Sequence, residues 1–312
     1  MFLLQAPEIR DCEVFTRLPE RFRRTGVRTA WAEANRGGAP TDSFLEGPVF
    51  DADGHLYVTD IPFGRIFRID PQGQWSLVAE WDGEPNGAKF LNTRELLVTD
   101  YRHGLMAVDV MTGAVRPYLE RRNSERFKGV NDLIFDSRGN LYFTDQGQSG
   151  LHDPSGRLYR LRPGGQLDLL LANLPSPNGV ALSPDERVLY LAVTRANQVW
   201  RVPLMDDGSV SKVSAFFTSH GPSGPDGLAV DEAGRVLVAN PGLGRVWVLD
   251  ALAEPEQVLL SPAGRSLTNL AFGGADRRTL YCTESVSGSI LRVTLDRAGL
   301  PIHRGAGTES AS

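Results

Sequence analysis

The stretch 129–145 reads Gly129-Val-Asn-Asp-Leu-Ile-Phe-Asp-Ser-Arg-Gly-Asn-Leu-Tyr-Phe-Thr-Asp145, and the chain nearly repeats it as Gly224-Pro-Asp-Gly-Leu-Ala-Val-Asp-Glu-Ala-Gly-Arg-Val-Leu-Val-Ala-Asn240. A third copy is Leu45-Glu-Gly-Pro-Val-Phe-Asp-Ala-Asp-Gly-His-Leu-Tyr-Val-Thr-Asp60, and weaker copies begin near residues 85, 177 and 267. Each copy consists of a polar residue, a short apolar strand, a turn, and a second strand rich in β-branched and aromatic residues. This pattern predicts a repeated β-hairpin.

The spacing of the copies indicates their architecture. The polar residues that lead the six copies are Glu46, Asn86, Asn131, Asn178, Asp226 and Thr268. They are separated by 40 to 48 residues, a period that suits a four-stranded propeller blade. An apolar residue follows each leading residue by four places, and this register selects Thr268 over Asn269 in the last copy. We therefore predict an all-β, six-bladed β-propeller.

Acidic residues recur at the far end of the second strand. Asp60, Asp100 and Asp145 each lie 14 residues after their leading residue, as does Asn240. We expect these aspartates to stabilise turns by accepting hydrogen bonds from backbone amides.

The last copy is one strand short of a blade. An N-terminal strand, from either 13–16 or 27–32, is expected to complete it and to close the ring, which removes exposed strand edges. The prediction is a single domain spanning 1–312. It has an N-terminal strand and lead-in over 1–43, blades over about 44–296, and a disordered tail over about 300–312.

Composition excludes several classes of protein. The net charge is −5 and no basic patch dominates, which argues against a nucleic-acid partner. Cys12 and Cys282 are too few for a disulfide framework, and Cys282 is expected to be a small buried hydrophobe. The chain has no apolar run of about 20 residues and no signal-peptide pattern. We therefore expect a soluble cytoplasmic protein that does not bind membranes; oligomeric state leaves no signal in the sequence.

The leading residues are expected to form a ring, because the first strand of each propeller blade lines the central channel. Each of the six offers an oxygen acceptor, and none offers sulfur or imidazole. Oxygen donors with two formal negative charges suit Ca²⁺ or Mg²⁺. The alternative is local: Asn-Gly and Asp-Gly are also turn dipeptides.

Four motifs carry a family resemblance: Leu45-Glu-Gly-Pro48, Val130-Asn-Asp132, Ser176-Pro-Asn-Gly179 and Gly224-Pro-Asp-Gly227. They resemble those of the senescence-marker-protein/gluconolactonase/luciferin-regenerating-enzyme family, which includes drug-responsive lactonases and is similar to diisopropylfluorophosphatase. The resemblance covers about residues 44–296. It implies that Glu46, Asn131, Asn178 and Asp226 hold one catalytic divalent cation. Ca²⁺ is expected, with Zn²⁺, Mg²⁺ and Mn²⁺ as possible replacements.

One position departs from the sugar-lactone members. They carry a substrate-gripping Arg two places before the Asn of the Asn-Asp motif, and Gly129 stands there in this chain. The sequence thus resembles the bacterial lactonase branch more closely.

The predicted function is metal-dependent hydrolysis of a small lactone or ester. The cation polarises the carbonyl and water attacks it. Asp226 is the predicted general base, with Glu46 or a hydroxide on the metal as alternatives. The predicted substrate-binding residues are Asn86, Asp132, Gln146, His152, Arg195 and Asn269.

Two other functions remain open at this stage. The same ligands would serve a phosphotriester or P–F hydrolase. A non-catalytic propeller of the NHL type would instead have a basic or aromatic face and a filled, metal-free channel.

Overall fold

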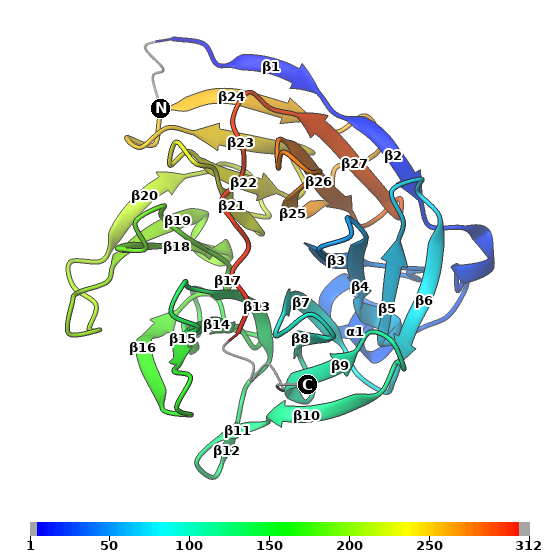
Figure 1. The fold of residues 1–312 in the computed structure, drawn as a ribbon, viewed down its shortest axis with the longest axis horizontal. Coiled ribbons are helices and arrows are strands. Elements are labelled where there is room, and N and C mark those ends of the chain that lie inside the picture. Colours follow the sequence, from blue (N-terminus) through cyan, green and yellow to red (C-terminus); the bar gives the residue numbers. More distant parts are fainter. Residues whose placement is uncertain (1–4, 306–312) are drawn as a thin grey trace.

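Each predicted repeat begins a four-stranded antiparallel sheet, and six such sheets surround a central axis (Figure 1). The structure is a computed structural model and describes residues 5–305. The predicted six-bladed propeller is confirmed. Blades 1 to 3 contain β3 (Leu45–Phe50), β4 (Leu56–Asp60), β5 (Arg65–Ile69) and β6 (Trp75–Glu80); β7 (Pro85–Phe90), β8 (Glu95–Asp100), β9 (Gly104–Asp109) and β10 (Val115–Leu119); and β13 (Val130–Phe135), β14 (Leu141–Asp145), β15 (Gly156–Leu161) and β16 (Leu167–Leu174).

The remaining blades follow the same plan. Blades 4 to 6 contain β17 (Pro177–Leu182), β18 (Val188–Val193), β19 (Gln198–Pro203) and β20 (Ser214–Thr218); β21 (Leu228–Val230), β22 (Val236–Asn240), β23 (Arg245–Leu249) and β24 (Pro255–Leu260); and β25 (Leu267–Gly273), β26 (Thr279–Glu284) and β27 (Ser289–Thr294). Short elements outside the blades are β11 (Arg121–Arg122), β12 (Glu125–Arg126) and three 3₁₀ turns at Glu20–Phe22, Ile61–Phe63 and Thr194–Ala196.

The core lies between the blades. Every residue of β4, β14 and β22 is buried, because both faces of a second strand pack against neighbouring blades. This explains why these strands read as continuous β-branched and apolar runs rather than as an alternating pattern.

The glycines after the leading residues allow the first strands to approach closely. A Cβ on Gly179 would lie 2.2 Å from the carbonyl oxygen of Asp226 in the next blade. A Cβ on Gly227 would lie 2.3 Å from Oδ1 of Asn269. Both dipeptides, Asn178-Gly179 and Asp226-Gly227, are therefore sites of close contact between blades rather than simple turns.

Buried hydroxyl groups connect successive blades at the same point. The Thr59 hydroxyl of blade 1 donates to the carbonyl of Asn86 in blade 2 at 2.6 Å. The Thr144 hydroxyl of blade 3 donates to the carbonyl of Asn178 in blade 4 at 2.9 Å. These bonds fix the main chain of the leading residues.

The acidic residues at the strand ends bind backbone amides, as predicted. Asp60 accepts from the amide of Phe44 at 2.7 Å, and Asp145 accepts from the amide of Gly129 at 2.9 Å. Each carboxylate thereby holds the segment that enters its own blade.

An N-terminal strand closes the ring. β2 (Glu13–Arg17) pairs antiparallel with β27 and completes blade 6, which confirms the first of the two predicted positions. The second, 27–32, is wrong: α1 (Ala30–Arg36) begins there, capped by the Thr29 hydroxyl. β1 (Glu8–Asp11) adds a parallel fifth strand to blade 5.

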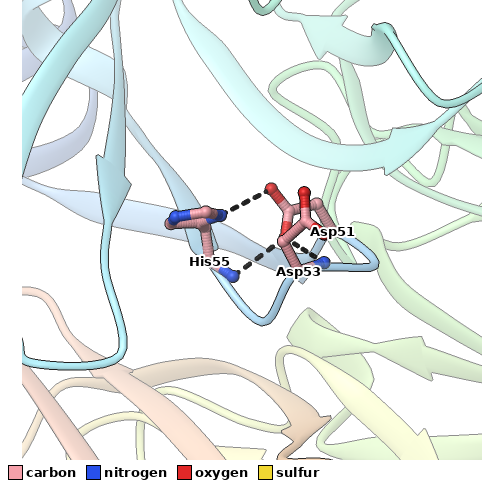
Figure 2. A group of neighbouring side chains, drawn as sticks. All are labelled: Asp51, Asp53 and His55. Carbon is pink, nitrogen blue, oxygen red and sulfur yellow. Dashed lines mark hydrogen bonds and ion pairs between the residues drawn. The ribbon is translucent and has the colours of Figure 1, made fainter.

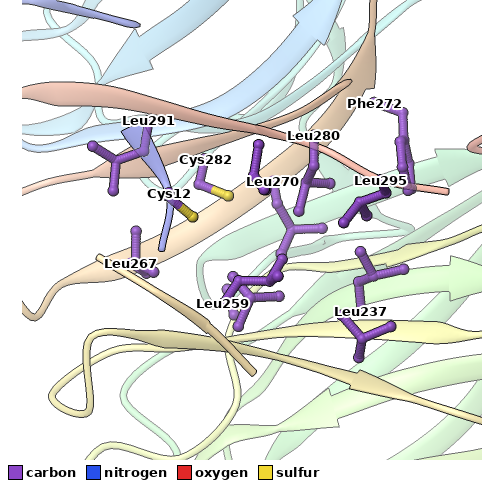
Figure 3. Close-up of a cluster of buried hydrophobic side chains, with 14 residues drawn as sticks. Cys12, Leu237, Leu259, Leu267, Leu270, Phe272, Leu280, Cys282, Leu291 and Leu295 are labelled. Atoms are coloured by element: carbon purple, nitrogen blue, oxygen red, sulfur yellow. The ribbon is translucent and has the colours of Figure 1, made fainter. Parts of the chain in front are cut away.

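The two cysteines lie where this N-terminal segment joins blade 6 (Figure 3). Cys12 and Cys282 are buried in one apolar cluster, as expected for Cys282. Burial raises the pKa of the Cys12 thiol to about 12, so both behave as apolar packing groups.

The C-terminal segment passes over the blades near the central axis (Figure 1), and residues 300–303 line a cavity together with the ends of β13 and β21 that lie away from the leading residues. The amide of Leu300 donates to the carbonyl of Val230, and His303 lies 3.3 Å from Glu186. The expected disordered tail thus begins with residues that make contacts, and 306–312 lie outside the described residues. Among the elements of 5–305, no helix has both the length and the apolar character needed to cross a membrane.

The inter-blade hydroxyl bonds can be tested by removing one of them. We expect Thr59→Val to lower the free energy of unfolding by about 1–3 kcal/mol, because the partly buried Asn86 carbonyl loses its donor. Urea denaturation measures this, with Thr218→Val on an exposed outer strand as the matched control. Equal stability of the two variants would show that the bond contributes nothing.

Candidate metal centre

The four predicted ligands come from four blades and meet at the start of the first strands. Glu46 lies in β3, Asn131 in β13 and Asn178 in β17, and Asp226 lies two residues before the start of β21. The first three side chains are buried, and Asp226 is partly exposed to the channel. Strands β3, β13, β17 and β21 line the channel, as Figure 1 shows.

Glu46 is buried with one carboxylate oxygen occupied. Its Oε2 accepts from the amide of Gly47 at 3.0 Å and from Nδ2 of Asn269 at 2.9 Å. Burial raises its pKa to about 7, although both hydrogen bonds oppose that shift. Oε1 makes no hydrogen bond within residues 5–305, so it is available to a ligand.

Asp226 is the second axial carboxylate with a raised pKa. Its pKa is raised well above the usual value by burial, and then by the negative charges of Glu46 and Asp132. Neighbouring Asn178, through a side-chain hydrogen bond, and Arg195, through its charge, oppose the shift.

Asp132 lies within the channel rather than in an outer pocket wall. Its Oδ1 accepts from the amide of Leu133 at 2.8 Å, and burial raises its pKa. The positive charge of Lys89 is the largest influence that lowers this pKa. Sequence reasoning missed Lys89; its position three places after Asn86, on a strand that lines the channel, was the available signal.

The amides of Asn131 and Asn269 each contact a specific partner. Asn131 donates from Nδ2 to Oε1 of Gln146 at 3.0 Å. Asn269 donates to Glu46, so both Gln146 and Asn269 contact predicted ligands. These contacts give two predicted substrate-binding residues a second role.

The two leading residues that are not predicted metal ligands, Asn86 and Thr268, make contacts between blades. Asn86 is partly exposed, and its carbonyl accepts the Thr59 hydroxyl. Pairing of Leu267 with Glu284 confirms the register that selects Thr268. The Thr268 hydroxyl, however, bonds Ser285 and the carbonyl of Leu45, so it serves ring closure and is not an axial oxygen donor.

The remaining predicted residues lie at the loop face. His152 and Arg195 are both exposed. A Cβ on Gly150 would lie 3.0 Å from the His152 ring and 3.9 Å from the Arg195 side chain, so the two side chains are close neighbours. The charge of Arg195 reaches Asp226, as its effect on that pKa shows.

A cavity of about 760 Å³ continues the channel beyond the carboxylates toward the opposite face. Lys89, Asp132, Val180 and Leu228 line its inner part, and Leu300 lies at its outer end. A filled channel, which the non-catalytic alternative predicts, is not what the described residues form.

A second cluster of acidic residues stabilises a turn and is not a second metal centre. Asp51, Asp53 and His55 gather in the β3–β4 hairpin (Figure 2). Asp51 Oδ1 accepts from the amides of Asp53 and His55, both at 2.9 Å, and Oδ2 lies 3.0 Å from the His55 ring. Asp231 makes the same pair of backbone bonds in blade 5, which identifies the carboxylate as a turn-stabilising group.

The axial residues fit a hard divalent cation. Their free atoms are carboxylate and amide oxygens, the donors that Ca²⁺ and Mg²⁺ prefer. In the absence of a cation, the negative charge of Asp132 raises the pKa of Glu46, and Glu46 and Asp132 both raise the pKa of Asp226. A bound cation would reverse that effect.

Comparison with known proteins identifies the family of the chain. A family model described as the SMP-30/gluconolactonase/LRE-like region matches residues 44–286. A protein named lactonase drp35 from Staphylococcus haemolyticus is 30% identical over 261 residues, which cover 78% of each chain. Its namesake from Staphylococcus aureus is 30% identical over 247 residues, covering 75% of this chain and 73% of that protein.

Solved structures share the fold. A calcium-binding protein, regucalcin, from Agrobacterium tumefaciens superimposes with a TM-score of 0.77 at 20% identity, covering 96% of this chain and 99% of that one. A gluconolactonase from Xanthomonas campestris superimposes with a TM-score of 0.70 at 22% identity, covering 88% and 99%.

The raised pKa of Glu46 gives a prediction for the metal-free protein. The folded state holds this proton more tightly than the unfolded state, so Glu46 contributes stability below pH about 4.5 that is lost as the pH rises through about 7. We expect the melting temperature of wild type, relative to Glu46→Gln, to fall between pH 5 and pH 8. Saturating Ca²⁺ should restore it at pH 8.

Thermal melts of chelator-treated protein in metal-free buffers measure both effects. The Gln side chain keeps an acceptor for Asn269, so the comparison isolates the charge. A difference that does not change with pH would contradict the raised pKa of Glu46.

Proposed function

The chain belongs to the SMP-30/gluconolactonase/LRE-like family, and on that premise we propose that it is a divalent-metal-dependent lactonase. Its lactonase relatives support hydrolysis of a lactone. The single observation that favours metal dependence is the convergence of Glu46, Asp132 and Asp226 on the axis, where the negative charge of Asp132 raises the pKa of Glu46 and both raise the pKa of Asp226.

Glu46, Asn131, Asn178 and Asp226 would hold the cation. Glu46 offers Oε1, because Oε2 is occupied by Gly47 and Asn269. When bound, the cation supplies Lewis-acid polarisation of the lactone carbonyl and electrostatic stabilisation of the developing negative charge. Ca²⁺ is the proposed ion, since all four donors are oxygens and two of them are carboxylate oxygens.

Asp226 is the proposed general base that takes a proton from the attacking water. Its carboxylate faces the channel, and none of its oxygens accepts a backbone hydrogen bond within the described residues. Asp132 differs because its Oδ1 is held by the amide of Leu133. Among the axial carboxylates, Asp226 therefore combines access to the channel with proximity to Asn178 and Glu46.

The loop face provides the proposed substrate contacts. Arg195 and His152 are exposed neighbours beside Asp226 and can donate to the oxygens of a lactone or its carboxylate product. Asn86 is partly exposed on the opposite side of the ring, in β7.

Lactone hydrolysis by the chelated protein tests this function. We expect activity on a panel of γ- and δ-lactones, including gluconolactone, to disappear with a chelator and to return with Ca²⁺. Asp226→Asn keeps an amide oxygen for the cation but removes the base, so kcat should fall by at least about 100-fold.

Asp132→Asn is the comparison for the base assignment. If it lowers kcat more than Asp226→Asn while Ca²⁺ binding is unchanged, the base is misassigned. An activated phosphotriester is assayed in parallel. If the Ca²⁺-loaded protein hydrolyses this compound and no lactone, the alternative hydrolase function replaces the one proposed.

A further inference from the structure

The amide of Asn131 is oriented by a neighbour. An asparagine side chain has one oxygen that can bind a cation and one NH₂ group that cannot. Nδ2 of Asn131 donates to Oε1 of Gln146 at 3.0 Å, and Oδ1 makes no hydrogen bond within residues 5–305. The oxygen is thus the atom that remains free for the channel.

Gln146 is itself fixed at several points. Its Nε2 donates to the Ser176 hydroxyl at 2.9 Å, and its backbone amide donates to the carbonyl of Gly129 at 2.8 Å. The Ser149 hydroxyl donates to the Gln146 carbonyl and accepts from the amide of Ser176 at 3.0 Å. This network joins blade 3 to the segment that enters blade 4.

We propose that Gln146 is a positioning residue that makes Asn131 a metal ligand by binding its NH₂ group and leaving Oδ1 for the cation. This inference rests on the proposed metal-dependent function and assigns Gln146 a role other than the direct substrate contact expected from the sequence. Mutating a group that orients the ligand of a metal typically lowers metal affinity or activity by about 10- to 100-fold.

The corresponding contact of Asn269 with Glu46 is less decisive. The two oxygens of a carboxylate are equivalent, so either can ligate when the other is occupied. An amide has a single ligating atom, and rotation by 180° would turn the NH₂ group toward the cation. Orientation therefore matters more at Asn131 than at Glu46.

Calorimetric titration with CaCl₂ near neutral pH measures the effect. We expect Gln146→Met, which keeps the volume but removes the acceptor, to weaken Ca²⁺ affinity by about 10- to 100-fold. Gln146→Glu keeps an acceptor for Nδ2 and should bind Ca²⁺ at least as well as wild type. Gln148 lies in the same loop, and within the described residues its side chain bonds the Tyr101 hydroxyl alone. Gln148→Met should therefore leave the Ca²⁺ affinity unchanged.

A second background separates orientation from loss of structure. In Asn131→Asp either oxygen can bind the cation, so adding Gln146→Met should cost much less affinity there than in wild type. An equal cost in both backgrounds would mean that Gln146 acts only by supporting the loop, and the inference would be wrong.

The outcomes also separate this inference from the proposed function. If wild type binds Ca²⁺ and opens lactones but Gln146→Met binds Ca²⁺ equally well, only the positioning role fails. If wild type binds no divalent cation, the metal-dependent function fails and the positioning role fails with it.

Discussion

The structure depends on contacts that fix the leading residues between two blades. In blades 1 to 3, a threonine hydroxyl near the end of the second strand donates to the main-chain carbonyl of the next leading residue, as Thr59 does to Asn86 and Thr144 to Asn178. In blade 5 the equivalent position is Ala239, which has no hydroxyl, and the amide of Gly227 donates to the carbonyl of Thr268 instead. Because the main chain makes these contacts, most leading side chains remain free to serve the axis.

This arrangement concentrates negative charge at a buried point. Glu46, Asp132 and Asp226 come from three blades that are distant in sequence, and each has a raised pKa. Isolated buried carboxylates are unfavourable, and Lys89 is the one internal cation identified as offsetting Asp132 among the described residues. A divalent cation bound on the axis would neutralise this negative charge. The same carboxylates would carry out the proposed chemistry.

The sequence repeats predict the fold and the ring of leading residues, because the same packing requirement applies in each of the six blades. Residues that must pass near the axis, such as Gly179 and Gly227, recur at blade spacing, so the alignment locates the ring without any coordinates. Features that occur only once in the chain cannot be found by aligning repeats. The strand that closes the ring could not be chosen between two segments, because both have suitable composition and only pairing with β27 distinguishes them.

Side-chain direction was also beyond the sequence. Thr268 stands in the predicted register, yet its hydroxyl turns to Leu45 and Ser285 because blade 6 must close on blade 1. The side-chain amide of Gln146, the residue that follows β14, binds Asn131 of β13, and periodicity does not encode such a contact.

Anomalous diffraction from crystals soaked in MnCl₂ tests the central claim most directly, because it locates the cation itself. The account predicts a peak on the axis, with oxygens of Glu46, Asn131, Asn178 and Asp226 in its coordination shell. An empty axis, or binding only at the Asp51–His55 turn, would contradict it.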